Sequence, residues 1–68
     1  MRIILCIFPL CEEAIALQVE DSEVNRTVEE YMNKGFFVRV FNYDEGLRYI
    51  ELLEQQLKIR VYWEVKWR

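Results

Sequence analysis

Residues 36–68 read FFVRVFNYDEGLRYIELLEQQLKIRVYWEVKWR, and patterns typical of a strand, a helix and a strand follow one another in them. The run Phe36–Tyr43 consists of aromatic and β-branched residues apart from Arg39 and Asn42 and holds no glycine or proline, as in a strand that is apolar on both faces. Asp44 is suited to cap a helix. An apolar stripe at helical spacing follows it, formed by Leu47, Ile50, Leu53 and Leu57. Gly46 lowers the helix propensity of the first turn slightly without interrupting the helix.

The end of this segment, residues 58–68, alternates strictly in polarity. One set of alternate positions is apolar, namely Ile59, Val61, Trp63, Val65 and Trp67. The other set is polar or amphipathic, namely Lys58, Arg60, Tyr62, Glu64, Lys66 and Arg68. This period of two predicts a strand with one buried and one exposed face. Because a helix separates it from the strand at 36–43, the two strands are expected to be parallel or to share a sheet through a right-handed crossover.

Another helix is expected immediately before this segment. Asp21 and Ser22 are good N-cap residues, and Glu23 adds a carboxylate to the first turn. Apolar side chains then recur at helical spacing at Val24, Val28, Tyr31 and Met32. Lys34 and Gly35 supply a cationic last turn and a residue that readily adopts the left-handed conformation, so the helix should end there.

The first twenty residues favour a β-hairpin. Residues 2–8 are short, apolar and β-branched, and Pro9 ends the run, which predicts a strand rather than a secretory signal with its small-residue cleavage site. Residues 10–20 are ambiguous, because their apolar side chains fit both a strand and a helix. The alternation of Ile15, Leu17 and Val19 favours a strand. The hairpin would then span 2–20 and turn around 9–13.

Together these elements predict an α+β fold in one domain over residues 1–68. We expect a small two-layer sandwich with a three- or four-stranded mixed sheet and two helices on one face. The order is ββαβαβ, or βαβαβ if residues 10–20 are helical. Two glycines and one proline in 68 residues exclude a disordered or collagen-like chain. No apolar run approaches the ~20 residues that cross a bilayer, so no membrane partner is expected.

The sequence offers little that could carry catalysis. Histidine is absent, which removes the commonest general base and the commonest metal ligand. The candidate nucleophiles Cys6, Cys11, Ser22 and Thr27 therefore lack an activating imidazole. Two cysteines are too few for a structural zinc site, and a glycine-rich phosphate loop is missing. We predict no enzymatic activity, no metal and no cofactor, and two reduced thiols in a cytoplasmic protein.

Charge is distributed unevenly along the chain. The net charge is −3, and residues 10–30 hold most of the carboxylates, namely Glu12, Glu13, Glu20, Asp21, Glu23, Glu29 and Glu30. Such a segment is either a solvated surface or an acidic patch that docks on a basic surface of a larger protein. We take the acidic patch as the leading candidate binding site.

A second candidate site is the sheet surface that two helices on one face would leave open. It would present aromatic and basic residues of the kind enriched at interfaces, namely Phe37, Arg39, Phe41, Tyr43, Arg60, Tyr62 and Lys66. Residues 34–41 match four of the eight positions of the RNP1 octamer of RRM domains, which is too few to assign a family. The net charge also makes nucleic acid an improbable partner.

These observations favour a small non-catalytic protein-binding module. One specific form is an acidic inhibitor that blocks a basic surface of a nucleic-acid-processing complex. In size and charge alone, the chain is similar to phage-encoded anti-restriction and anti-CRISPR proteins. The alternatives are a binder of single-stranded nucleic acid through the open sheet face and a self-assembling homodimeric structural subunit.

Overall fold

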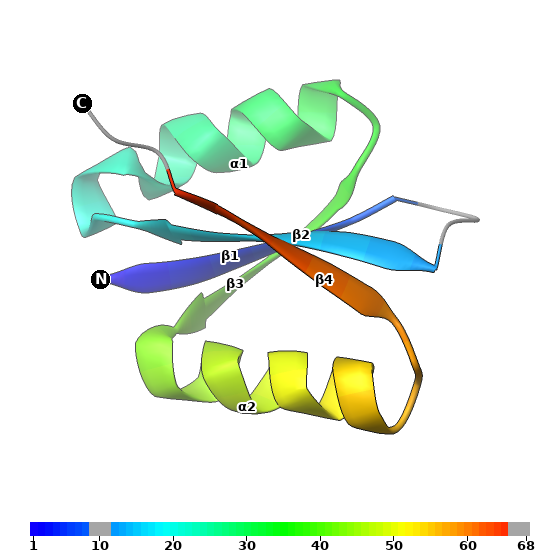
Figure 1. The fold of residues 1–68 in the computed structure, drawn as a ribbon. Coiled ribbons are helices and arrows are strands. Elements are labelled where there is room, and N and C mark those ends of the chain that lie inside the picture. Colours follow the sequence, from blue (N-terminus) through cyan, green and yellow to red (C-terminus); the bar gives the residue numbers. More distant parts are fainter. Residues whose placement is uncertain (9–11, 66–68) are drawn as a thin grey trace.

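The computed structural model describes residues 1–8 and 12–65, and for Val65 the backbone alone. The chain forms four strands and two α-helices, and a short 3-10 turn precedes the first helix (Figure 1). In chain order the elements are β1 (Arg2–Ile7), β2 (Glu13–Val19), the 3-10 turn (Asp21–Glu23), α1 (Val24–Asn33), β3 (Phe37–Asn42), α2 (Tyr43–Gln55) and β4 (Arg60–Val65). The predicted α+β class and the order ββαβαβ are confirmed.

The four strands form one mixed sheet in the order β3-β1-β2-β4. The central strand β1 runs antiparallel to both β2 and β3, and β4 runs parallel to β2. The predicted N-terminal hairpin is therefore present, because residues 13–19 form a strand paired with β1 rather than a helix. The strands β3 and β4 share the sheet and run in the same direction, but they lie at its two opposite edges.

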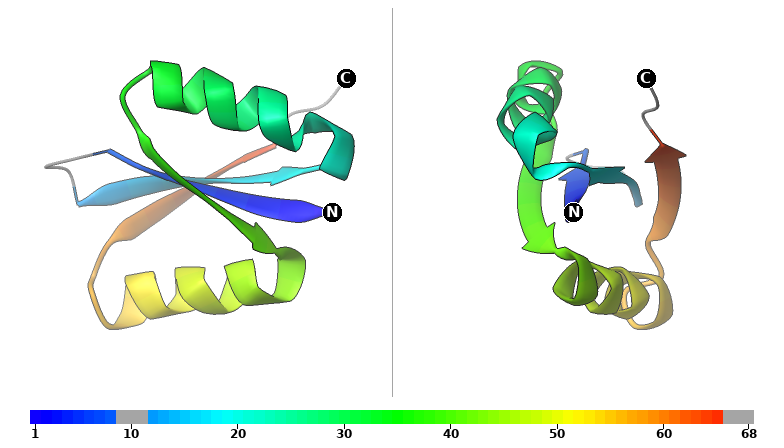
Figure 2. Two further views of the ribbon diagram at one scale, coloured as in Figure 1. Left: turned by 180° about the vertical axis from the view of Figure 1, so that it is seen from behind. Right: turned by 90° about the vertical axis from the view of Figure 1, so that its left-hand side faces the viewer.

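The prediction of both helices on one face is wrong, because α1 and α2 cover opposite faces of the sheet (Figures 1 and 2). The strand order supplies the physical reason. The connection β2-α1-β3 crosses the sheet in one direction, and the connection β3-α2-β4 crosses it in the other. Right-handed crossovers in opposite directions place their helices on opposite faces. The architecture is therefore helix, sheet and helix, with no face left entirely open.

The core is divided into two layers by the sheet. On the α2 side the buried residues are Ile3, Leu5, Ala14, Ala16, Ile50 and Leu53. On the α1 side they are Ile4, Cys6, Leu17, Val19 and Tyr31. Alternate side chains of β1 enter the two layers, which explains why this strand is apolar throughout.

Helix α1 begins and ends in different ways. The predicted cap residues Asp21 and Ser22 lie in the 3-10 turn, and the residue at the N-cap position, Glu23, makes no capping hydrogen bond with its side chain. The end follows the prediction, since Gly35 has a φ of 94°. Its amide donates to the carbonyl of Met32 at 3.0 Å, and the amide of Phe36 donates to that of Tyr31 at 3.1 Å. This Schellman motif turns Phe36 back onto the Tyr31 ring.

The structure differs from the prediction in three details of helix α2: its N-cap residue, its buried apolar residues and the role of its glycine. Asn42 caps it instead of Asp44, because the Asn42 side chain accepts a hydrogen bond from the Glu45 amide at 2.8 Å. Of the predicted apolar stripe, Ile50 and Leu53 are buried, whereas Leu47 is more exposed and Leu57 lies beyond the helix at 61% exposure. Gly46 is buried against β1, where a Cβ would overlap the Ile3 side chain. A glycine is therefore required for this close approach.

Candidate protein-binding groove

The two helices cover their faces of the sheet to different extents. Helix α2 packs against β3, β1 and β4, whereas α1 packs mainly against β3 and β1. The α1-side surface of β4, and of the start of β2 up to Ile15, is consequently left without a helix over it (Figure 2, right), whereas Leu17 and Val19 of β2 are buried in the α1-side core. This uncovered strip follows from the topology, because the crossover that contains α1 only has to pass over β1.

A groove of about 570 Å³ occupies this strip between the end of α1 and β4. Apolar and aromatic residues line most of it, and its charged lining residues are both carboxylates. The lining consists of Phe8, Glu13, Ala14, Ile15, Phe36, Tyr62 and Glu64. A concave, largely aromatic surface with a few polar groups is the usual form of a binding site.

The wall on the α1 side is a row of three aromatic rings. Phe8 and Phe36 meet edge to face with centroids 5.4 Å apart, and Phe36 meets Tyr31 in the same way at 5.7 Å. Tyr31 is only 4% exposed, so it anchors this row in the core. The position of Phe36 is set by the left-handed Gly35 before it. Phe36 is therefore held by packing on Tyr31 and by the backbone geometry at Gly35, whereas Phe8 follows the end of β1 and is 43% exposed.

The carboxylates of the groove are each held by a tyrosine hydroxyl. Tyr62 Oη donates to Glu13 Oε2 at 3.1 Å, and Tyr31 Oη donates to Glu64 Oε2 at 3.0 Å. Burial, together with the hydrogen bond to Glu64, raises the pKa of Tyr31 to about 12. At neutral pH Tyr31 is therefore a donor, and both carboxylates keep acceptor capacity for a bound cation.

The structure distributes the predicted acidic patch over three places. Glu12 and Glu13 lie at the start of β2, and Glu20 and Asp21 lie at its other end. Glu29 and Glu30 lie on α1, and Glu23 precedes it. Six residue steps separate Glu13 from Val19 at the two ends of β2, a span of about 20 Å. Of the seven residues, Glu13 is the one that lines the groove.

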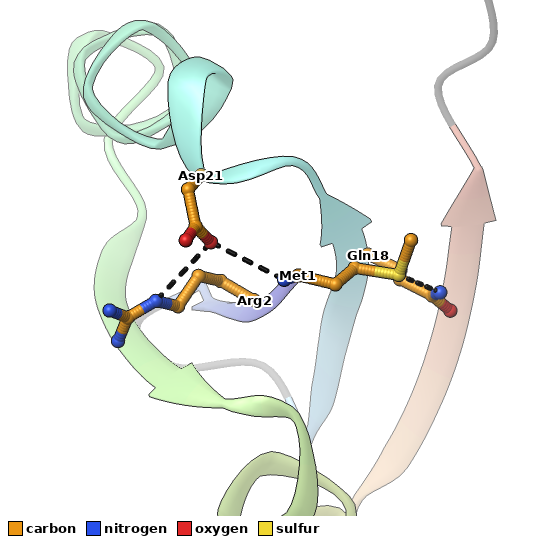
Figure 3. Close-up of polar contacts among 4 residues, drawn as sticks. All are labelled: Met1, Arg2, Gln18 and Asp21. Carbon is orange, nitrogen blue, oxygen red and sulfur yellow. Dashed lines mark hydrogen bonds and ion pairs between the residues drawn. The ribbon is translucent and has the colours of Figure 1, made fainter.

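Several of these carboxylates also have cationic partners. Asp21 lies 3.4 Å from the amino group of Met1 and 3.5 Å from Nε of Arg2, and the Met1 side chain contacts Gln18 (Figure 3). Glu23 pairs with Arg26 at 4.0 Å, and Glu30 pairs with Lys34 at 3.4 Å. These cations lower the negative electrostatic potential that the carboxylates would otherwise produce together.

The residues of the predicted aromatic and basic face are also separated. The strand register places Phe37, Arg39 and Phe41 of β3 on the α2 side, where Phe41 stacks on Tyr49 at 5.0 Å. Arg60 and Tyr62 lie on the α1 side of β4, at the opposite edge of the sheet. Tyr43 is the first residue of α2, and Lys66 lies outside the described residues. The assumption of one open face is thus contradicted, and Tyr62 is the member of this set that lines the groove.

The candidate nucleophiles occupy structural positions. Cys6 is buried in β1, Ser22 lies in the 3-10 turn, and Thr27 donates from Oγ1 to the carbonyl of Glu23 at 2.8 Å. Cys11 lies outside the described residues. Within residues 1–8 and 12–65, no three cysteine or carboxylate side chains gather as metal ligands would.

No protein-family model, curated protein or solved structure matches this chain. In the described part of the chain, neither helix is long and apolar enough to cross a membrane. The groove is therefore the feature of the molecule that bears on function.

Sequence reasoning missed Phe8, Ile15, Phe36 and Glu64 as site residues. Phe36 begins a run that predicts a strand and carries no signal of a site, and Glu64 belongs to the strand face that the period of two predicts to be exposed. Their meeting depends on the strand order, which places β4 beside β2 and beyond the reach of α1. The period of 58–68 did place Tyr62 and Glu64 on the same face, and this was the one signal available.

Proposed function

We propose that the protein is a non-catalytic binding module that holds a segment of a larger protein in the groove between α1 and β4. The single observation that carries the proposal is the groove itself, with aromatic walls and two carboxylates within it. Phe36 and Tyr62 offer rigid aromatic surface at small entropic cost, and aromatic residues dominate binding energy at protein interfaces.

The lining also supports a particular chemistry for the partner. An apolar side chain would contact Ile15 and Phe36 at the floor and wall of the groove. Lysine or arginine next to that side chain would then reach Glu13 and Glu64, which both lie exposed at the surface. The net charge of −3 favours the approach of such a basic segment. The expected partner is a segment in which basic and apolar residues are adjacent.

Inhibition of a nucleic-acid-processing complex, binding of single-stranded nucleic acid, a cytoplasmic location and the lack of enzymatic activity stay predictions. A basic protein segment in the groove is compatible with the first of these. It opposes the second, because a phosphate backbone would be repelled by Glu13 and Glu64.

The experiment is a selection from a displayed random-peptide library on the immobilised protein. We expect enriched peptides to combine an apolar residue with lysine or arginine, and their affinity to fall about tenfold or more in Glu13→Lys. Glu29→Lys is the matched control, because it makes the same charge change on the exposed surface of α1, away from the groove. Equal binding to the two variants would contradict the proposal. A short oligothymidylate bound more tightly than any peptide would favour the nucleic-acid alternative.

A further inference from the structure

The outer edge of β4 is an unpaired strand edge. The strand pairs with β2 on one side only, and in the described part of the chain no element lies along its other side (Figure 1; Figure 2, right). Its register with β2 is continuous from Arg60 to Val65, without a bulge or a proline. Tyr62 and Trp63 at its centre are 47% and 44% exposed. Such an edge is a template for pairing with another strand.

The backbone groups that point outward can be identified. The Arg60 amide donates to the carbonyl of Glu12 at 3.0 Å, so the backbone groups of Arg60 face β2. Because successive strand residues turn their amides and carbonyls to opposite sides, those of Tyr62 and Glu64 also face β2. The amides and carbonyls of Val61 and Trp63 therefore face outward, with no strand beside them among the described residues.

We propose that β4 pairs antiparallel with β4 of a second copy of this chain, about a twofold axis that passes midway between the Tyr62 residues of the two copies. In this register Val61 of each copy lies opposite Trp63 of the other. These are the residues whose backbone groups face outward, so the two copies exchange four backbone hydrogen bonds. Each such pair also places a β-branched side chain against an aromatic one, which is a favourable cross-strand pair.

Charge complementarity favours a copy of this chain as the partner, and it fixes the register between the two β4 strands. Centring on Tyr62 places Arg60 opposite Glu64 of the partner copy, and the symmetry makes this pair twice. A shift by two residues in either direction removes this pairing. Arg60 and Glu64 then occupy positions without backbone hydrogen bonds between the strands, where side chains approach most closely. The other sheet edge, β3, has Arg39 as its one charged residue and offers no such match.

The pairing would join two four-stranded sheets into one of eight strands. A twofold axis perpendicular to the sheet keeps both α1 sides on the same face, so the two grooves flank the axis. Because the interface rests on one short strand, it is small, and we expect a dissociation constant on the order of 10 µM to 1 mM. This inference does not rest on the proposed binding of a protein segment, because the backbone pairing uses the outer edge of β4. The two share Glu64, which lines the groove and would also face Arg60 of the second copy.

The first test is sedimentation velocity on the wild-type chain from about 10 µM to 1 mM, the range of this weak-interface estimate. We expect a reversible increase from the mass of one chain to that of two. A constant mass of one chain over the whole range would overturn the proposal. Amide hydrogen exchange under the same conditions locates the contact. Protection of the Val61 and Trp63 amides should rise with concentration, while that of Tyr62 and Glu64 stays constant. Dimerisation without this alternation would also overturn it.

The second test exchanges the charges. Arg60→Glu alone and Glu64→Arg alone should each weaken self-association by about tenfold or more, because each brings like charges together twice. An equimolar mixture should associate again, since only the mixed dimer brings opposite charges together. Arg39→Glu, with the same charge change on β3, is the matched control and should leave self-association unchanged. Self-association that depends on Arg39 and not on Arg60 would place the contact at the other edge and contradict the proposal.

Discussion

On the α2 side of the sheet a helix crosses three strands in close contact with the central one, whereas on the α1 side a helix covers two strands and leaves a groove beside them. The α2 side is closed by Gly46, which lets the helix approach Ile3, and by the stack of Phe41 on Tyr49. The α1 side is tied to β4 by the hydrogen bond from Tyr31 to Glu64. The α2 side is a closely packed layer, whereas the α1 side combines a packed layer with an accessible groove.

The difference follows from topology rather than from hydrophobicity. The crossover from β3 to β4 must traverse the whole sheet, so α2 lies across it. The crossover from β2 to β3 passes over β1 alone, so α1 stays over one half. A sheet of this order with one helix per face therefore has an uncovered strip over β4 and the start of β2 on the α1 side. We take the location of the groove to be a consequence of the strand order.

The largest expected effect is at the closest contact of the α2 side. Glycine to alanine in an exposed helix is normally stabilising by about 1 kcal/mol. At Gly46 the new Cβ would overlap the Cβ of Ile3 and lie 2.7 and 2.8 Å from its Cγ1 and Cγ2. Gly46→Ala should therefore lower the free energy of unfolding by about 1–3 kcal/mol. Urea denaturation followed by circular dichroism measures the change.

The matched control for Gly46→Ala is Glu51→Ala, on the exposed surface of the same helix. It should change the free energy of unfolding by less than about 0.5 kcal/mol. If Gly46→Ala were neutral or stabilising, the helix would have room to move away from β1. The α2 side would then be no more tightly packed than the α1 side.

The next effect tests the polar contact that ties the α1 side to β4. Tyr31→Phe removes the hydroxyl that donates to Glu64 and should lower the free energy of unfolding by about 1 kcal/mol at neutral pH. The pKa of Tyr31 is raised to about 12 in the fold, first by burial and then by Glu64, against about 10 in the unfolded chain. The associated stability is complete below pH 10 and is lost as the pH rises towards 12.

Denaturation midpoints measured from pH 8 to 12 provide the readout for Tyr31. The wild-type chain should lose stability over the upper half of that range, and Tyr31→Phe should lose markedly less. Tyr43→Phe removes the same atom from an exposed ring and is the control, with an expected change close to zero at neutral pH. An alkaline transition unchanged in Tyr31→Phe would show that this contact does not couple α1 to β4.

On both sides the sequence predicts the elements better than it predicts their arrangement. Each element has a local signal, such as the period of two at 58–68 or the glycine that ends α1, and these place nearly all strands and helices correctly. The face on which each helix lies has no local signal, because it depends on whether β4 pairs beside β2 or beside β3. The groove could not be predicted for the same reason, because Phe36 and Glu64 line it together only when the strand order is β3-β1-β2-β4.

Residue-level choices on the α2 side show the same limit. Asn42 and Asp44 are both capping residues, and the one that caps is decided by where β3 ends. Gly46 resembles an ordinary helix glycine in the sequence, and its role depends on the distance between α2 and β1. Local chemistry therefore predicts the elements, whereas three-dimensional contacts decide which of several suitable residues carries a given role.

The smallest expected effect sharpens the comparison at the two helix exits. Helix α1 leaves its face through Gly35, with φ at 94°, whereas the link from α2 to β4 has a lysine, Lys58, at a φ of 57°. A residue other than glycine in the left-handed region costs about 1–2 kcal/mol, and a change to glycine removes this cost. Glycine also makes the unfolded chain more flexible, and this offsets part of the gain in stability. Lys58→Gly should therefore raise the free energy of unfolding by less than about 1 kcal/mol.

A matched pair of controls completes this test. Gln56→Gly, two residues earlier at a φ of −97°, should lower the free energy of unfolding, because an ordinary backbone position gains nothing from glycine. Gly35→Ala should also lower it, although the nearest atom to the new Cβ is 3.9 Å away, because the cost there is conformational rather than steric. A loss of stability in Lys58→Gly as large as in Gln56→Gly would mean that the exit of α2 stores no backbone strain. The segments that follow α1 and α2 would then carry the same conformational cost. The two faces would differ only in the close contact at Gly46 and in the groove.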